Sequence, residues 1–306
     1  MEKMPEKFWQ ELERLNLTTF FSEKEDIKAE IIIIRTKTQF DSKLIDKFPN
    51  LKLIIRAGSG FDNIDVLYAK SKGIEVCNTP EANAYSAYEH TLSMIFALIK
   101  NLQFGKQEIK SGKWKDKHPG NWEIPELKIL VVGLGRVGTR VAKAMKFLGA
   151  DVKAVDPELS QEEWQKKDVT PIHYIKGLEW CNLVTYHCPL YSDTFHYFNQ
   201  EVLQIINKPI WLVNAARGKI VDFEAVKLGL KKEKLLGAAL DVFEKEPWEA
   251  DSIIDDPRLV VTPHTGAFST AAKNRMSVEC VEVWRNFVQN SLVISPVDLR
   301  FINKFI

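Results

Sequence analysis

The second half of the chain carries three side-chain types that together could move a proton on a bound anion. Arg217, His264 and the acidic run Asp241–Glu246 each follow an apolar segment of strand character. Histidine, with an ordinary pKa of about 6.5, can give or take a proton near neutral pH. A carboxylate beside it favours imidazolium and orients the ring, and an arginine keeps its charge and can hold a carboxylate or carbonyl oxygen. The pattern therefore predicts an acid–base site for an anionic carbonyl compound.

A glycine pattern supplies a second kind of chemistry. The strand-like run Lys128–Val132 leads into Gly133, Gly135 and Gly138, spaced G-x-G-x-x-G, and a helical pattern follows. The first glycine permits a tight turn, the second lets backbone approach a pyrophosphate, and the third allows close helix packing. The helix amino terminus offers N–H groups to the phosphates, and Asp156, ending the next apolar run, can accept from ribose hydroxyls. These features predict a site for NAD.

A dinucleotide beside an acid–base group predicts hydride transfer to a carbonyl, because the alkoxide formed needs a proton and the reverse reaction needs a base. His264 could serve, and so could His187, which also follows a strand-like run of the nucleotide-binding region. Residue types alone leave these two histidines open. Surface or packing roles are expected for the other four, which are His90, His118, His173 and His196.

Two early strand-like runs also end in arginine. Ile31–Ile34 leads into Arg35, and Leu53–Ile55 leads into Arg56 and the loop Gly58–Gly60. Ligands of open α/β sheets bind beyond the carboxyl ends of strands, and guanidinium groups pair well with carboxylates and phosphates. Each arginine could instead cap a strand end in water. Their pairing with a glycine loop favours a receptor for an anionic small-molecule substrate.

Composition limits the other classes of protein. The 306 residues are 45% hydrophobic, enough for two cores, and the formal net charge of +1, with both signs interspersed, argues against nucleic acid and membrane surfaces as partners. No apolar run approaches the about 18 residues of a membrane span, and the amino terminus lacks the apolar core of a signal peptide. The four cysteines show no metal-ligand spacing. We therefore expect reduced thiols, no metal site and a cytoplasmic protein.

Alternating strand-like and helical patterns predict an α/β fold with parallel sheets. A long helical segment, from Ala84 to about Lys110, forms the crossover between two expected domains. Residues 1–99 with 286–306 are expected to form a substrate domain, and residues 100–285 a nucleotide-binding domain. The expected strands are Glu30–Ile34, Leu51–Ile55, Ile74–Cys77, Ile129–Val132, Val152–Val155, Leu183–Tyr186, Ile210–Asn214, Ala238–Val242 and Leu259–Thr262.

In combination, these motifs resemble the D-isomer-specific 2-hydroxyacid dehydrogenases over nearly everything from Glu30 onward. That family has two Rossmann-like or flavodoxin-like domains around an interdomain cleft. The motifs that carry the resemblance are Arg56-Ala-Gly-Ser-Gly-Phe-Asp-Asn-Ile-Asp65, Asn78-Thr-Pro80, Glu89-His-Thr91, the glycine pattern, His187-Cys-Pro-Leu190, Asn214-Ala-Ala-Arg-Gly218, Leu240-Asp-Val-Phe-Glu-Lys-Glu-Pro247 and Pro263-His-Thr-Gly-Ala267.

The resemblance implies a role for each group of residues. Arg217 would bind the substrate's carboxylate and carbonyl, His264 would be the acid/base, and Glu246 would orient it. Ser59 and Gly60 would hold the substrate carboxylate. The implied cofactor-binding residues are Ser59, Gly133, Gly135, Arg136, Val137, Gly138, Asp156, His187, Cys188, Pro189, Ala215, Ala216, Asp241, Gly266 and Ala267, among which the loop at His187 would touch the cofactor and Asp241 would lie near the nicotinamide carboxamide.

Within the family, the chain resembles the members that interconvert 3-phosphoglycerate and 3-phosphohydroxypyruvate in serine biosynthesis. Arg35–Thr38 resembles a segment that helps bind the substrate phosphate there, and Arg56 lies with it. A reductase of glyoxylate or hydroxypyruvate is one alternative, and a non-catalytic, NADH-sensing protein of the corepressor kind is another. The usual first strand is not recognisable, because the chain opens with the helical stretch Pro5–Leu12. The first sheet is therefore expected to be one strand short.

A homodimer is also expected. In the resembling family the helix after the first sheet commonly forms dimer arms, and in this chain its apolar residues cover more than one face. Packing inside one subunit is the alternative explanation for that apolar surface. The apolar residues concerned are Leu92, Met94, Ile95, Ala97, Leu98 and Leu102.

Overall fold

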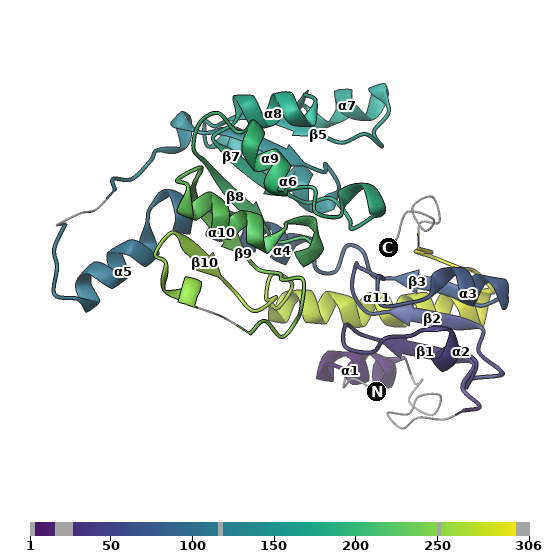
Figure 1. Ribbon diagram of the computed structural model, residues 1–306. Coiled ribbons are helices and arrows are strands. Elements are labelled where there is room, and N and C mark those ends of the chain that lie inside the picture. Colours follow the sequence, from purple (N-terminus) through teal and green to yellow (C-terminus); the bar gives the residue numbers. More distant parts are fainter. Residues whose placement is uncertain (1–3, 16–26, 116–118, 250–251, 298–306) are drawn as a thin grey trace. The chain divides into compact units, whose positions relative to one another are not determined.

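A computed structural model describes residues 4–15, 27–115, 119–249 and 252–297, and the chain forms two compact units (Figure 1). Unit 1 comprises Met1–Ser86 and Ala267–Ile306, and unit 2 comprises Ala87–Gly266. These boundaries differ from the expected ones after residues 99 and 285. Helix α4 (Ala84–Ile99) buries its apolar face in unit 2, whereas helix α11 (Thr270–Asn290) buries its own in unit 1.

Unit 1 is built on a parallel sheet with the strand order β1-β2-β3. Successive side chains of a strand point to opposite faces, and β2 shows this directly. Leu53 and Ile55 pack against α1 and α11, while Ile54 packs on the other face with the residues around α2 and α3. The elements are α1 (Glu6–Arg14), β1 (Ile31–Ile34), α2 (Ser42–Ile45), β2 (Leu53–Arg56), α3 (Val66–Ser71), β3 (Glu75–Asn78) and α11.

The expected loss of the first strand agrees with the described part of unit 1, in which the first element is helix α1. Phe8 and Leu12 of α1 are buried against Val281 and Trp284 of α11. The helix is strongly amphipathic, so its apolar stripe needs such a partner. Helix α1 thus packs on one face of the sheet. Among the described residues, this sheet has three strands.

Unit 2 is built on a seven-stranded parallel sheet with the order β10-β9-β8-β7-β4-β5-β6. Both faces of such a sheet must be covered. Leu130 and Val132 of β4 join one core with the residues of α8, α9 and α10, and Ile129 and Val131 join another with α4 and α6. The order runs outward from β4 in both directions, which places a topological switch point at the carboxyl end of β4.

The elements of unit 2 alternate along the chain after α4. The helices are α5 (Leu102–Lys110), α6 (Arg136–Phe147), α7 (Gln161–Lys167), α8 (Tyr174–Trp180), α9 (Gln200–Ile205) and α10 (Phe223–Lys231). The strands are β4 (Lys128–Val132), β5 (Asp151–Val155), β6 (Thr170–Pro171), β7 (Leu183–Tyr186), β8 (Ile210–Asn214), β9 (Leu235–Leu240) and β10 (Leu259–Val261). Short 3-10 turns are η2 (Ile124–Glu126), η3 (Ser192–Thr194), η4 (Gly218–Ile220) and η5 (Ser252–Asp255).

The predicted α/β class with parallel sheets is confirmed, and each of the nine expected strands has a counterpart in the structure. Two local expectations are wrong. Strand β6, only two residues long, was not expected, and the long helix breaks into α4 and α5 because Asn101 adopts the left-handed conformation with φ of 48°. The side chain of Lys100 fixes the break by donating to the carbonyl of Trp122 at 2.7 Å.

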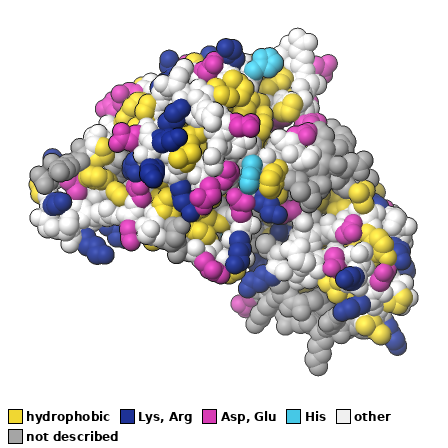
Figure 2. All heavy atoms as spheres, viewed as in Figure 1, with side chains coloured by type: hydrophobic (Ala, Val, Ile, Leu, Met, Phe, Trp, Pro, Cys, Tyr) yellow, Lys and Arg dark blue, Asp and Glu magenta, His cyan; other side chains and the backbone are white. Residues whose placement is uncertain are grey.

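Two properties of the described residues bear on partners. No helix among them is long and apolar enough to cross a membrane. On the face shown in Figure 2, acidic and basic side chains are interspersed, in keeping with the formal net charge of +1.

Candidate active site

The three glycines after β4 fit their predicted positions. Gly133 has a φ of 93°, which favours glycine, and a Cβ added to it would lie 2.6 Å from the backbone nitrogen of Cys188. A Cβ on Gly138 would lie 1.9 Å from the carbonyl oxygen of Gly133, so α6 packs directly on the turn. A Cβ on Gly135 would meet nothing within 4 Å. Open space therefore adjoins Gly135 at the amino terminus of α6.

Asp156 follows β5 and is tied to the glycine loop. Its Oδ2 accepts from the backbone nitrogen of Leu134 at 2.8 Å, and its Oδ1 accepts from that of Glu158 at 3.1 Å. Each carboxylate oxygen can accept more than one hydrogen bond, so Asp156 can still accept hydrogen bonds from ribose hydroxyls.

Lys167 also contacts the glycine loop, although no sequence motif pointed to it. Its Nζ donates to the carbonyl of Leu134 at 2.9 Å and contacts Thr139 Oγ1 at 3.1 Å.

His187 lies at the carboxyl end of β7, next to the glycine loop. Its backbone nitrogen donates to the carbonyl of Val132 at 2.7 Å, and its Nε2 lies 2.9 Å from Thr185 Oγ1. Burial lowers the pKa of this imidazole to about 3, so it is neutral at ordinary pH. A ring that stays neutral from pH 5 upward suits packing beside a ligand better than relaying protons.

Arg217 is positioned by a turn that Asn214 builds at the end of β8. The Asn214 amide donates from Nδ2 to the carbonyl of Arg217 at 2.9 Å and accepts at Oδ1 from the backbone nitrogen of Ala216 at 3.1 Å. The Arg217 guanidinium donates to the carbonyl of Ala216 at 2.7 Å. Asn214 is buried, and Ala215 and Ala216 are half-buried.

His264 and Glu246 form a pair at the carboxyl ends of β10 and β9. His264 Nδ1 lies 2.7 Å from Glu246 Oε2, and the backbone nitrogen of Phe243 donates to Glu246 Oε1 at 3.1 Å. Burial would raise the pKa of Glu246, but these hydrogen bonds outweigh it and hold that pKa below its usual range. The carboxylate is therefore ionised and accepts from Nδ1–H, so that Nε2 is the ring nitrogen outside this pair. His264 has a φ of 53°, unusual for a residue with a side chain.

The buried side chain of Asp241 binds the loop at 262–266, which carries His264. Its Oδ1 accepts from Thr262 Oγ1 at 2.5 Å and from the backbone nitrogen of Thr265 at 2.8 Å, and its Oδ2 accepts from that of Gly266 at 2.8 Å. His90, for which a surface or packing role was expected, lies with its Nε2 3.2 Å from Asp241 Oδ1. The loop at 262–266 thus depends on a carboxylate and on a histidine that sequence reasoning passed over.

The predicted substrate-binding residues other than Arg217 lie in unit 1. Arg56 is buried, and its guanidinium donates to the carbonyl of Ala57 at 2.8 Å and to Thr36 Oγ1 at 3.2 Å, so it does not cap its strand in water. A Cβ on Gly58, whose φ is 137°, would lie 1.8 Å from Arg56. Ser59 and Gly60, which follow, are half-buried.

Arg35 lies in a loop held by Asn63, another residue that sequence reasoning missed. Asn63 Nδ2 donates to the carbonyl of Arg35 at 3.0 Å and to that of Thr38 at 2.6 Å. Asn63 is itself buried, so this clamp fixes the backbone at both ends of the segment Arg35–Thr38. The sequence signal that could have identified Asn63 is its place in the family motif that runs from Arg56 to Asp65.

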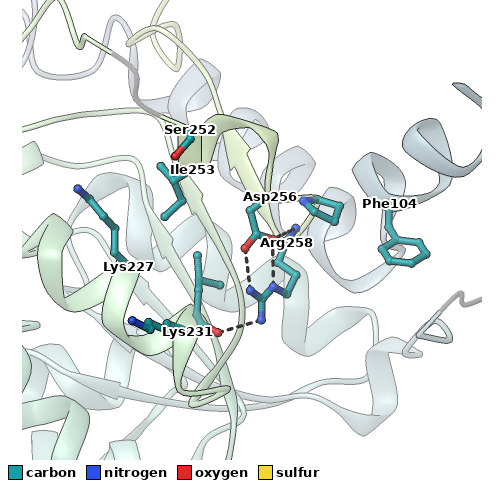
Figure 3. A pocket seen from close by; sticks show the side chains of 9 residues that line it. Phe104, Lys227, Lys231, Ser252, Ile253, Asp256 and Arg258 are labelled. Atoms are coloured by element: carbon teal, nitrogen blue, oxygen red, sulfur yellow. Dashed lines mark hydrogen bonds and ion pairs between the residues drawn. The ribbon is translucent and has the colours of Figure 1, made fainter. Parts of the chain in front are cut away.

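A separate hollow of about 660 Å³ lies in unit 2, and none of the predicted site residues lines it. Figure 3 shows Lys227 and Lys231 of α10, Phe104 of α5 and an ion pair between Asp256 and Arg258 around it. Arg258 also donates to the carbonyl of Leu230 at 2.9 Å. The described residues include no group of three or more His, Cys, Asp or Glu side chains that could hold a metal ion.

The sequence of the chain is similar to those of characterised dehydrogenases. The chain is 33% identical over 273 residues to D-3-phosphoglycerate dehydrogenase of Bacillus subtilis (strain 168), covering 89% of this chain and 52% of the relative. It is 33% identical over 296 residues to the D-3-phosphoglycerate dehydrogenase of Homo sapiens, covering 95% of this chain and 55% of the relative. The chain thus spans about half the length of the curated relatives it matches.

Solved structures share the fold over nearly the whole chain. A crystal structure of D-lactate dehydrogenase from Aquifex aeolicus, complexed with NAD and lactic acid, gives a TM-score of 0.82 at 27% identity and covers 94% of both chains. The TT0316 protein from Thermus thermophilus gives 0.83 at 26% identity and covers 97% of this chain and 98% of that one.

Residues 92–266 match the sequence profile described as "D-isomer specific 2-hydroxyacid dehydrogenase, NAD binding domain". That match covers most of unit 2 and contains Arg217, Glu246 and His264. The chain therefore belongs to the D-isomer specific 2-hydroxyacid dehydrogenase family and carries the family's NAD-binding domain.

Proposed function

We propose that this protein is an NAD-dependent oxidoreductase that interconverts a D-2-hydroxy acid and its 2-oxo acid. The observation that carries the proposal is the 2.7 Å contact between His264 and Glu246 in a unit that matches the family's NAD-binding domain. The pair provides a proton donor and acceptor with one fixed ring orientation. Arg217 provides a permanent cation at the end of β8, in the same sheet.

The glycine loop fits NAD, because Gly133 and Gly138 close the turn while open space adjoins Gly135. When bound, NADH supplies a hydride to the carbonyl carbon and NAD accepts one in reverse. Glu246 holds Nδ1–H of His264, and Nε2 gives a proton to the carbonyl oxygen during reduction or takes one from the hydroxyl during oxidation. Arg217 holds the substrate's carboxylate and polarises its carbonyl.

The substrate that we favour is the pair 3-phosphoglycerate and 3-phosphohydroxypyruvate, in serine biosynthesis. The relatives named D-3-phosphoglycerate dehydrogenase support this choice, as does the loop Arg35–Thr38. Its backbone is clamped by Asn63, so the Arg35 side chain projects from a fixed position. Guanidinium groups bind a phosphate dianion through paired, charge-assisted hydrogen bonds. The substrate domain and the NAD-binding domain would then be unit 1 and unit 2.

One experiment tests both the chemistry and the substrate. NADH oxidation is followed with 3-phosphohydroxypyruvate, hydroxypyruvate, glyoxylate and pyruvate, for the wild type and for His264→Asn, Arg35→Ala and Lys43→Ala. We expect His264→Asn to lower kcat about 10²- to 10⁴-fold with every substrate, while NADH still binds. Arg35→Ala should lower kcat/KM about 10- to 150-fold for 3-phosphohydroxypyruvate alone, since a charge-assisted bond contributes about 1.5–3 kcal/mol.

Lys43→Ala is the matched control, because Lys43 is an exposed cation of α2 outside the clamped loop. Equal losses for phosphorylated and unphosphorylated substrates in Arg35→Ala would reject the phosphoglycerate assignment and leave the dehydrogenase proposal intact. NADH binding without turnover of any 2-oxo acid would reject the enzyme and favour an NADH-sensing protein.

We also propose a homodimer that forms around α5 and a location in the cytoplasm. Met94, Ile95 and Leu98 pack in the core of their own subunit, so they no longer support a dimer. The exposed apolar side chains lie farther along, at Leu102, Ile109 and Trp114, of which Trp114 is 80% exposed. Several exposed apolar side chains in one short segment favour an interface there. All four cysteines are free thiols, which suits a reducing compartment.

A further inference from the structure

The loop that carries His264 is held from one side by a single carboxylate. The Asp241 side chain is 2% exposed and binds residues on both sides of His264, namely Thr262 and the backbone nitrogens of Thr265 and Gly266. The backbone nitrogen of His264 also donates to the carbonyl of Asp241 at 2.7 Å. The direction of the His264 ring therefore depends on where Asp241 is held.

His90 reaches this carboxylate from helix α4. Its Nε2 lies 3.2 Å from Asp241 Oδ1 and 3.0 Å from Thr262 Oγ1. An ionised carboxylate only accepts hydrogen bonds, and the Thr262 hydroxyl points its own hydrogen at Asp241 over 2.5 Å. Both neighbours of His90 Nε2 are therefore acceptors, so Nε2 carries the hydrogen and donates it.

The ionisation state of Asp241 agrees with this assignment. Burial would raise the pKa of Asp241, but the hydrogen bonds from His90, from Thr262 and from the backbone of Thr265 and Gly266 outweigh burial and hold that pKa below its usual range. The carboxylate is thus ionised and needs every donor around it. His90, with a side chain 20% exposed, is a donor from outside the loop itself.

Gly266 shows how closely the loop packs on this pair. A Cβ added to Gly266 would lie 2.9 Å from Asp241 Oδ2 and 3.4 Å from His90 Cδ2. A side chain there would push the carboxylate away from the loop, while the imidazole lies at ordinary contact distance. The absence of a side chain at residue 266 therefore lets Asp241 accept from the backbone nitrogen of Gly266.

We propose that His90 is a positioning residue, which holds Asp241 and Thr262 by donating from Nε2 and thereby directs His264 Nε2 at the substrate carbonyl. The inference rests on the proposed function only for the identity of the reaction. It assigns to helix α4 a part in the chemistry, since α4 supplies the donor that fixes the acid–base loop.

The test compares His90→Phe, which keeps a ring but removes the donor, with His90→Gln, which keeps an N–H donor of similar reach. We expect His90→Phe to lower kcat about 10- to 100-fold with KM for the 2-oxo acid changed less than about 3-fold, by loss of one hydrogen bond to a charged group. His90→Gln should recover most of that loss. In a His264→Asn background, His90→Phe should have little further effect, because both changes act through one group.

A second measurement does not need turnover. Hydrogen exchange at the amides of Thr265 and Gly266, both bound to Asp241, should quicken about 10-fold in His90→Phe and return towards the wild-type rate in His90→Gln. If His90→Phe does not fold, His90→Leu makes the same comparison. Unchanged kcat with unchanged exchange in an active wild type overturns the inference, as does an equal loss of kcat in the His264→Asn background. A wild type that turns over no 2-oxo acid overturns the proposed function instead, and the exchange rates still decide the role of His90.

Discussion

At the scale of single residues, the contact between Glu246 and His264 could be expected from the sequence, and the contacts that support it could not. Residue types left His264 and His187 open, and the resemblance to the family implied the pairing of His264 with Glu246, which the structure places 2.7 Å apart. His90 contacts Asp241, which lies 151 positions further along the chain, and Asn63 contacts Arg35, which lies 28 positions before it. No local pattern of spacing reports such contacts, because they exist only once strands and helices have packed.

Asp156 should make the protein prefer NADH to NADPH. A 2′-phosphate on the ribose would approach its carboxylate, and two like charges about 4 Å apart repel by about 4 kcal/mol at an effective dielectric of 20. Half of that corresponds to about 30-fold. Steady-state kinetics should therefore show kcat/KM at least about 30-fold higher with NADH than with NADPH. Equal values for the two cofactors would place Asp156 away from the ribose.

His187 should make the protein sensitive to acid. Its folded-state pKa is about 3, below the ordinary value of about 6.5, so a neutral ring stabilises the fold above pH 6.5 and that contribution is lost as pH falls. The loss is about 1.4 kcal/mol per pH unit. Between pH 6.5 and 5 the unfolding free energy of His187→Gln should fall by about 2 kcal/mol less than that of the wild type, measured by denaturant unfolding. If the unfolding free energies of the two proteins fell equally over this pH range, the His187 ring would take up its proton in the folded state as readily as in the unfolded state.

At the scale of elements, the sequence predicted strands better than helices. Strands β2 and β4 are short, continuous apolar runs whose side chains are buried on both faces of the sheet, and such runs mark the strands of parallel sheets in the sequence. The break between α4 and α5 did not follow, because Asn101 turns the chain where the apolar pattern continues. Strand β6 consists of two residues and is too short to leave a pattern.

The clamp on Arg35–Thr38 is a property of two neighbouring loops. Asn63→Ala would remove the donor that the half-buried carbonyl groups of Arg35 and Thr38 share, and each lost hydrogen bond costs about 0.5–1.5 kcal/mol. We expect kcat/KM for 3-phosphohydroxypyruvate to fall about 10-fold or more, while hydroxypyruvate is reduced at nearly the wild-type rate. A loss shared equally by both substrates would mean that Asn63 maintains unit 1 as a whole and has no special effect on the phosphate loop.

At the scale of the whole molecule, helix α5 is the feature to test. Ile109→Asp places a charge among its exposed apolar side chains, and we expect it to shift the protein from dimer to monomer at micromolar concentration, measured by analytical ultracentrifugation. Phe147→Asp is the matched control, because Phe147 is 91% exposed on α6 and should leave the dimer intact. A wild type that sediments as a monomer would contradict the assembly altogether.

The chain passes between its two units at 86/87 and again at 266/267. His90 follows the first passage by one helical turn, Gly266 stands at the second, and both lie against Asp241. The two connections therefore leave unit 2 from one small region, centred on a single carboxylate. The hydrogen bonds of Asp241 and His90 therefore fix the part of unit 2 from which both connections depart, and not only the acid–base loop.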